Sequence, residues 1–235
     1  MSILDIAVLV VIALCVLFGC YRGFFTSALK AASFFVSWIL AYLIHPLLSW
    51  LLGTDGVIRT LVNYTEGAAK LKMVSMEQAF LPVSSVDPSQ LNDIVSKSSL
   101  VSPFTNMVKQ NITAQNLADK GLTTVGEYFD YTVAYATLNI ISFILLFIVF
   151  RLILGLLINL MDATHPLPVL KHYDTLMGGL MGALRGFFGL YLVGALVPVA
   201  LSVFNMTDAV LQGAPLLRFF YQSNFILLLM RGTIL

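Results

Sequence analysis

The chain has 235 residues, of which 59% are hydrophobic and only 11% are charged. Its 13 Lys and Arg residues and 12 Asp and Glu residues give a net charge of +1, so it lacks the basic field that attracts nucleic acid. A mean hydropathy of +0.91 is high for a soluble surface built from so few charges. We therefore expect an all-α integral membrane protein surrounded by membrane lipids.

Four apolar runs are long enough to cross about 30 Å of hydrocarbon as helices. They are Ile3–Phe18, extended by Gly19 and Cys20, then about Ala31–Leu51, Tyr131–Met161 and Leu176–Phe204. We expect residues 1–52 to hold spans one and two and residues 131–204 to hold spans three and four. Together they should form a four-helix bundle.

Residues 53–130 form the one sizeable polar insert, with six Lys or Arg and eight Asp or Glu residues. Asp87-Pro88 and Ser102-Pro103 are typical helix starts, because proline suits the first turn. The sequence Thr124–Glu127 is a capping box, so the third span should begin in water and continue into lipid. We expect two to four short amphipathic helices in the insert.

The tail, residues 205–235, is expected to form an interfacial or re-entrant helix, because its apolar stretch Asn224–Leu229 is too short to cross. Lys and Arg favour cytoplasmic loops. Arg22 and Lys30 lie in the first connection and Lys171 lies in the third. We therefore expect both termini and the insert to be extracytoplasmic.

One heptapeptide pattern occurs twice, since Gly19–Phe25 and Gly182–Phe188 both read G-x-x-R-G-F-F. One interpretation is a matched pair of arginine sites, Arg22 and Arg185, that hold lipid phosphates or an anionic solute. The other interpretation, which we favour, is a snorkelling arginine beside a packing glycine.

Span four carries small residues at successive four-residue steps, at Gly178, Gly182 and Gly186. This spacing is typical of close helix packing in membranes. The glycine face can pack inside the protomer or between protomers, and we favour packing inside. The expected protein partners are a second copy of the chain or other membrane proteins.

A polar stripe follows the expected cytoplasmic half of span three, where Arg151, Gly155, Asn159 and Asp162 recur at helical spacing. Exposing such a stripe to lipid is costly. We therefore expect Arg151, Asn159 and Asp162 to line one polar cavity together with Arg185.

The sequence contains no nucleophile elbow, phosphate-binding loop, dinucleotide fingerprint or metal-binding histidine spacing. We accordingly expect no catalytic residues, no metal and no cofactor, and predict that the protein is not an enzyme.

Two blocks of the chain resemble the colicin V production protein (CvpA) family. Asp5 and the apolar run into Arg22-Gly23 resemble its opening span and glycine-arginine-glycine turn, and Leu167–Leu170 resembles the proline-led loop before its glycine-rich last span. The motif positions are Arg22, Gly23, Asp174, Gly178, Gly182 and Gly186. The insert Gly53–Asp130 and the tail beyond Phe204 fall outside these blocks.

The resemblance implies a multispanning protein of the bacterial inner membrane, linked to colicin V production, toxin biosynthesis or export, and envelope physiology. We expect a non-enzymatic accessory or scaffold role. The alternative is an oligomeric small channel or transporter with an arginine-lined site for an anion or a lipid head group. A membrane enzyme acting on lipid-linked substrates is a third and weaker alternative.

Overall fold

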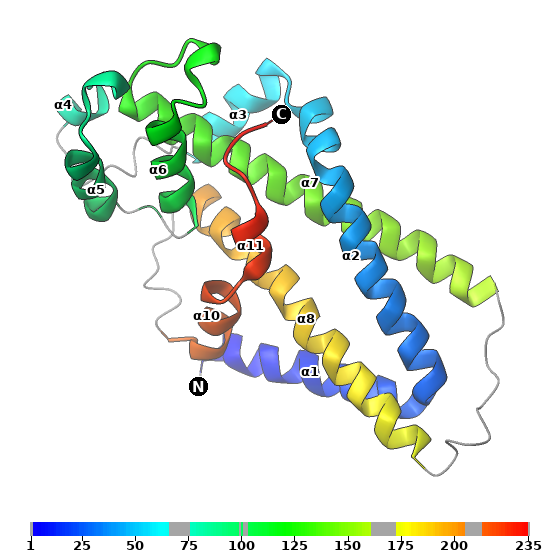
Figure 1. Ribbon diagram of the computed structural model, residues 1–235. Helices are drawn as coiled ribbons and strands as arrows, with labels where there is room; N and C mark the ends of the chain where they lie inside the picture. The colour runs from blue at the N-terminus through cyan, green and yellow to red at the C-terminus, as the bar shows by residue number, and fades with distance from the viewer. Residues whose placement is uncertain are drawn as a thin grey trace. The chain divides into compact units, whose positions relative to one another are not determined.

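The computed structural model of the chain describes residues 2–65, 76–98, 100, 103–160, 173–204 and 213–234. The regular elements in these residues are helices, and an isolated bridge joins Pro82 to Thr124. The all-α expectation is therefore confirmed for the described residues. The elements in Figure 1 are α1 (Ile3–Arg22), α2 (Phe24–Leu52), α3 (Asp55–Thr65), α4 (Met76–Ala79), α5 (Pro88–Lys97), α6 (Phe104–Ala114), α7 (Val125–Leu160), α8 (Asp174–Val203), α10 (Pro215–Gln222) and α11 (Phe225–Leu229), with short 3-10 turns at Val83–Ser85 and Ala118–Lys120.

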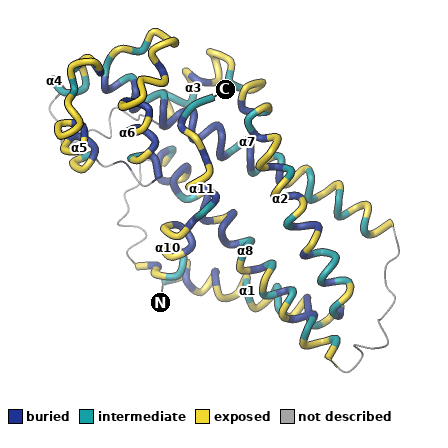
Figure 2. Tube along the Cα trace, viewed as in Figure 1, coloured by how far each residue is buried: buried dark blue, intermediate teal, exposed yellow. Residues whose placement is uncertain are grey.

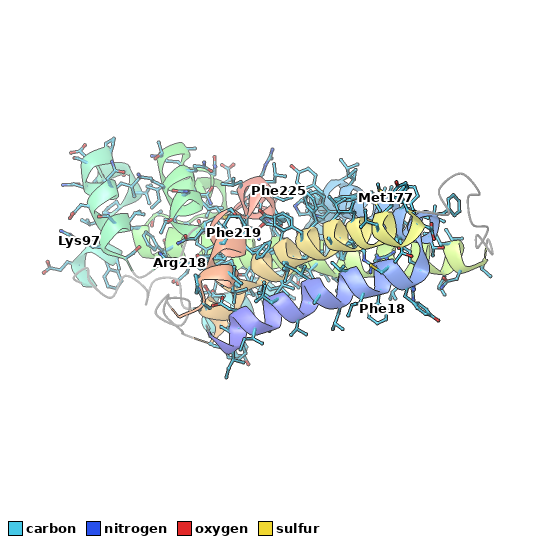
Figure 3. The ribbon with its side chains drawn as sticks, turned by 90° about the horizontal axis from the view of Figure 1, so that it is seen from below. Phe18, Lys97, Met177, Arg218, Phe219 and Phe225 are labelled. Carbon is cyan, nitrogen blue, oxygen red and sulfur yellow. The ribbon has the colours of Figure 1, made fainter. Side chains whose placement is uncertain are left out.

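Within the described residues, four helices are long and apolar enough to cross a membrane, namely α1, α2, α7 and α8. Many of their apolar residues are exposed, and Figure 2 shows exposed residues along each of these helices. Phe18, for example, is 54% exposed and lies on the side of α1 that is turned away from α8 (Figure 3). Such surfaces suit a hydrocarbon environment.

Helix α7 begins at Val125, earlier than the expected span at Tyr131, so residues 125–130 belong to the long helix. The predicted capping box is confirmed. The Glu127 carboxylate accepts hydrogen bonds from the backbone N–H groups of Thr123 and Thr124 at 2.8 and 2.9 Å, and the Glu127 N–H donates to the Thr124 hydroxyl at 3.4 Å. These bonds satisfy amides that a helix start otherwise leaves without partners.

Contacts divide the chain into two compact units. The first comprises residues 1–45, 143–194 and 211–224, and the second comprises residues 46–142, 195–210 and 225–235. The division therefore falls within α2, α7 and α8, next to Pro46 in α2 and four residues before Pro198 in α8. Proline removes a helical hydrogen bond at both places.

In the first unit, α10 is attached to the two helices around it. The Asp5 carboxylate, which is 1% exposed, accepts a hydrogen bond of 2.9 Å from the Leu216 N–H at the start of α10. The Asn224 amide donates to the Tyr191 carbonyl of α8 at 2.7 Å. Phe220 of α10 packs against Phe187 and Tyr191, with ring centroids 5.2 and 5.3 Å apart. Helix α10 is thus held through both its ends and its aromatic face.

The tail differs from the single helix we expected. Its described part, residues 213–234, forms two short helices, α10 and α11, which are separated at Ser223-Asn224. At this break the Asn224 side chain donates a hydrogen bond to the Tyr191 carbonyl of α8, a tertiary contact that a local sequence pattern does not predict. A position of these helices at the membrane interface stays a prediction.

In the second unit, the helices of the insert pack around the start of α7. The insert helices expected after Asp87-Pro88 and Ser102-Pro103 are α5 and α6, although Ser102 itself lies outside the described residues. Phe104 and Val108 of α6 and Phe129 of α7 are fully buried. The insert therefore has an apolar core of its own.

Two buried asparagines hold the segment that follows α11. Asn111 donates hydrogen bonds to the Thr132 hydroxyl at 2.9 Å and to the Gly232 carbonyl at 2.8 Å. Asn139 donates to the Arg231 and Thr233 carbonyls at 2.7 and 3.0 Å. These bonds supply partners to backbone carbonyls that no helix satisfies.

Asn139→Ala should destabilise the second unit by about 1–3 kcal/mol, because two backbone carbonyls lose their donor. Thermal unfolding of the detergent-solubilised chain measures the effect. Asn63→Ala on the exposed face of α3 is the control and should leave the midpoint unchanged. Equal midpoints for the two variants would show that the amide of Asn139 does not hold this segment.

Candidate functional site

The first motif copy forms the turn between α1 and α2. Gly23 adopts φ +77°, a conformation that glycine reaches without strain. The Asp174 carboxylate accepts a hydrogen bond of 2.9 Å from the Phe24 N–H, the first amide of α2. Asp174 is also the first residue of α8, so one negative charge lies at the N-termini of two helices, where the helix dipole favours it. Gly23 and Asp174, two of the motif positions, therefore meet at this turn.

The glycines of span four form a close contact with α1. A Cβ added to Gly178 would collide with the Gly19 carbonyl, and one added to Gly182 would collide with the Cys15 carbonyl. A Cβ on Gly186 would lie 2.9 Å from Cys15 Cβ. We call these five residues the glycine interface. It runs antiparallel along the C-terminal half of α1 and the N-terminal half of α8, which lie next to each other in Figures 1 and 3.

The glycine interface lies within one chain, so the structure gives the intramolecular packing that we favoured. It also brings the two motif copies together, because a Cβ on Gly19 of the first copy would lie 3.1 Å from the Gly182 Cα of the second. Backbones can approach this closely only where both helices present small residues. The repeated glycines are therefore two sides of one contact.

Four cationic side chains surround one pocket in the first unit. They are Arg22 of α1, Lys30 of α2, Arg151 of α7 and Arg185 of α8. The pocket has a volume of about 290 Å³, and Gly155, Ile158 and Asn159 of α7 complete its lining. We call it the cationic pocket.

The cationic pocket contains three of the four residues that we expected to share a cavity, namely Arg151, Asn159 and Arg185. The fourth, Asp162, lies outside the described residues. Arg22 and Lys30 were not expected there. A binding role for these residues stays a prediction.

A serine orients the central arginine of the pocket. The Arg151 Nη1 group donates a hydrogen bond of 2.7 Å to the Ser33 hydroxyl, which itself donates to the Lys30 carbonyl at 3.0 Å. Sequence reasoning missed this partner. The available signal was the three-residue spacing of Lys30 and Ser33, which places them on one face of α2.

No carboxylate lines the cationic pocket in the described residues, and none of its four cations forms a salt bridge there. The salt bridge found in these residues joins Lys97 to Asp93 on α5. Lys30, Arg151 and Arg185 are half-buried, so their charges are less screened than charges in water. The lining of the pocket therefore carries a positive potential that favours an anion over a cation.

The apolar helices and the polar pocket within them define a multi-pass helical membrane protein. A family model described as "Colicin V production protein" matches residues 4–100 and 110–224. The chain therefore belongs to the colicin V production protein family. Comparisons with curated proteins and with solved structures find no match.

The family match corrects one expectation. The insert Gly53–Asp130 and the tail beyond Phe204 do not lie outside the family, because the match includes most of the insert and continues to residue 224. The two sequence blocks that indicated the family resemblance were defined by short motifs around arginine and glycine. The insert helices instead pack through ordinary apolar side chains, such as Leu91 and Ile94, which leave no short motif.

Gly182→Ala should lower the stability of the chain by about 1–3 kcal/mol, because the new methyl group meets the Cys15 carbonyl. Gly189→Ala on the same helix is the matched control, since a Cβ there meets nothing within 4 Å. The thermal unfolding midpoint in detergent should fall for the first variant and stay level or rise for the second. An unchanged midpoint for Gly182→Ala would argue against the close approach of α1 and α8.

Proposed function

We propose that this chain is a non-enzymatic accessory or scaffold protein of the bacterial inner membrane. It assists toxin production or export, or maintenance of the cell envelope. Membership of the colicin V production protein family is the observation that carries this proposal. The proposed orientation places both termini and the insert outside the cytoplasm, because Arg22 at the end of α1 and Lys30 in the second turn of α2 favour the cytoplasmic side.

The outer face of α7 is available for the helix contacts that such a role needs. Leu152, Leu156 and Leu160 follow each other at four-residue steps and are 63%, 65% and 80% exposed. The glycine interface is already occupied inside the chain, so it is not available to a partner. We propose that the leucine face of α7 contacts a second copy of the chain or another membrane protein.

The second candidate function is an oligomeric small channel or transporter with a preference for anions. The cationic pocket is the observation that favours it, because four cations without a carboxylate attract negatively charged solutes. The two candidates differ in whether solute crosses the membrane.

A photo-crosslinking residue at position 156 should give a defined adduct in bacterial membranes, either with a second copy or with one partner identified by mass spectrometry. The same residue at position 190 is the control, because Leu190 is 3% exposed and faces the interior of the chain. No adduct from position 156 would contradict the scaffold role. If chloride or phosphate enters reconstituted vesicles and Arg151→Gln abolishes this flux, the channel becomes the preferred function in place of the scaffold.

Cysteine accessibility tests the proposed orientation. With both native cysteines replaced by serine, Asp93→Cys on the exposed surface of α5 should react with a membrane-impermeant maleimide in intact spheroplasts. Lys171→Cys should react only after the membrane is permeabilised, because the third connection is assigned to the cytoplasm. The opposite pattern would reverse the orientation.

A further inference from the structure

The cationic pocket concentrates charge in a way that individual snorkelling does not explain. Snorkelling side chains at the ends of different helices each reach for water or a lipid head group on their own. Here, Arg22, Lys30, Arg151 and Arg185 come from four different helices and converge on one cavity of about 290 Å³. Bringing four positive charges together costs free energy unless an anion or water compensates for it.

We propose that the cationic pocket binds a phosphate group. A guanidinium group presents a planar set of donors that matches phosphate oxygens in pairs, and the pocket contains three guanidinium groups and one ammonium group. A phosphate has several acceptor oxygens and can therefore bond to cations that approach from different helices. A chloride ion accepts no such paired bonds.

The arrangement of the pocket allows a phosphate to enter and be held. Arg22 and Asn159 are exposed, whereas Lys30, Arg151 and Arg185 are half-buried. The Ser33 hydroxyl takes one Nη1 hydrogen bond and fixes the Arg151 guanidinium, which leaves other N–H groups of that side chain for a ligand. The exposed residues form an entrance, and the half-buried cations bind the ligand further in.

The length of helix α1 fits an entrance at the level of the lipid head groups. Helix α1 has 20 residues and so extends about 30 Å, the thickness of the hydrocarbon core, before it ends at Arg22. Arg185 lies about three turns, or roughly 16 Å, beyond Asp174 along α8. Arg22 is therefore the pocket residue nearest the end of α1, where a lipid phosphate or a free phosphate in water would first meet the pocket. Both bring the same chemical group.

This inference deepens the second candidate function, since it names the anion that the cationic pocket selects. It does not require transport. A phosphate-bearing lipid held in the pocket would equally suit a scaffold that stays bound at one membrane surface.

The experiment uses the full chain, purified in detergent and stripped of lipid. Sodium phosphate and sodium chloride are titrated at equal ionic strength while the thermal unfolding midpoint is followed. In a separate arm, native mass spectrometry counts phosphatidylglycerol and phosphatidylcholine molecules retained by the chain. The first arm reports free phosphate and the second reports a lipid head group.

The test variant is Arg151→Gln combined with Arg185→Gln. The matched control is Arg59→Gln, because Arg59 is an exposed cation on α3 outside the pocket. We expect phosphate or phosphatidylglycerol to bind to the wild-type chain and to Arg59→Gln with equal affinity. Binding to the double variant should be about tenfold weaker or more, since charge-assisted bonds are lost. Lysine at both positions should restore part of the affinity.

Three outcomes would overturn the proposal. They are no binding of either probe, chloride acting as well as phosphate, and equal loss of binding in Arg59→Gln and the double variant. If the double variant does not fold, Arg22→Gln is used in its place, because Arg22 is exposed at the entrance. The affinity of Arg22→Gln for phosphate should be several-fold lower than that of the wild-type chain. An unchanged affinity would overturn the proposal. If phosphate binds but no flux into vesicles is measured, the channel function is excluded and the proposed phosphate site still stands.

Discussion

The close approach of α1 and α8 determines the geometry of the first unit. Because Gly178 and Gly182 carry no side chain, the backbone of α8 lies directly against the carbonyls of Gly19 and Cys15. This contact brings Asp174 to the start of α2, where it caps the Phe24 amide. In a bilayer, where apolar side chains gain little from contacting each other rather than lipid, such close backbone packing is a principal source of helix association.

The same contact brings the cations together. Arg22 precedes Gly23 at the turn, and Arg185 precedes Gly186 in the glycine interface. When the glycines pack, the neighbouring arginines are carried to the same pocket, where α7 contributes Arg151. The repeated motif thus combines two properties, since its glycines bring helices close and its arginines supply charge. Packing and electrostatics are therefore coupled in this region, and a change in one will alter the other.

The sequence predicted the parts of this structure that depend on local pattern. Apolar runs gave the four long helices, and Thr124–Glu127 gave the start of α7. Helical spacing placed Arg151 and Asn159 on one face. It could not place Lys30 in the pocket or Ser33 against Arg151, because both positions depend on how α2 packs against α7. The break at Ser223-Asn224 was missed for the same reason, since it depends on a bond from Asn224 to the Tyr191 carbonyl.

The cap of Asp174 on Phe24 has a consequence for biosynthesis. The two residues are 150 positions apart, so the Phe24 amide at the start of α2 is synthesised well before its acceptor, Asp174 at the start of α8. At bacterial translation speeds, this interval is roughly 8 to 30 s. During that time the hydrogen bond between the Phe24 amide and Asp174 at the turn between α1 and α2 cannot form. Because α8 is synthesised after α1 and α2, the turn between α1 and α2 obtains its side-chain cap only when α8 is present.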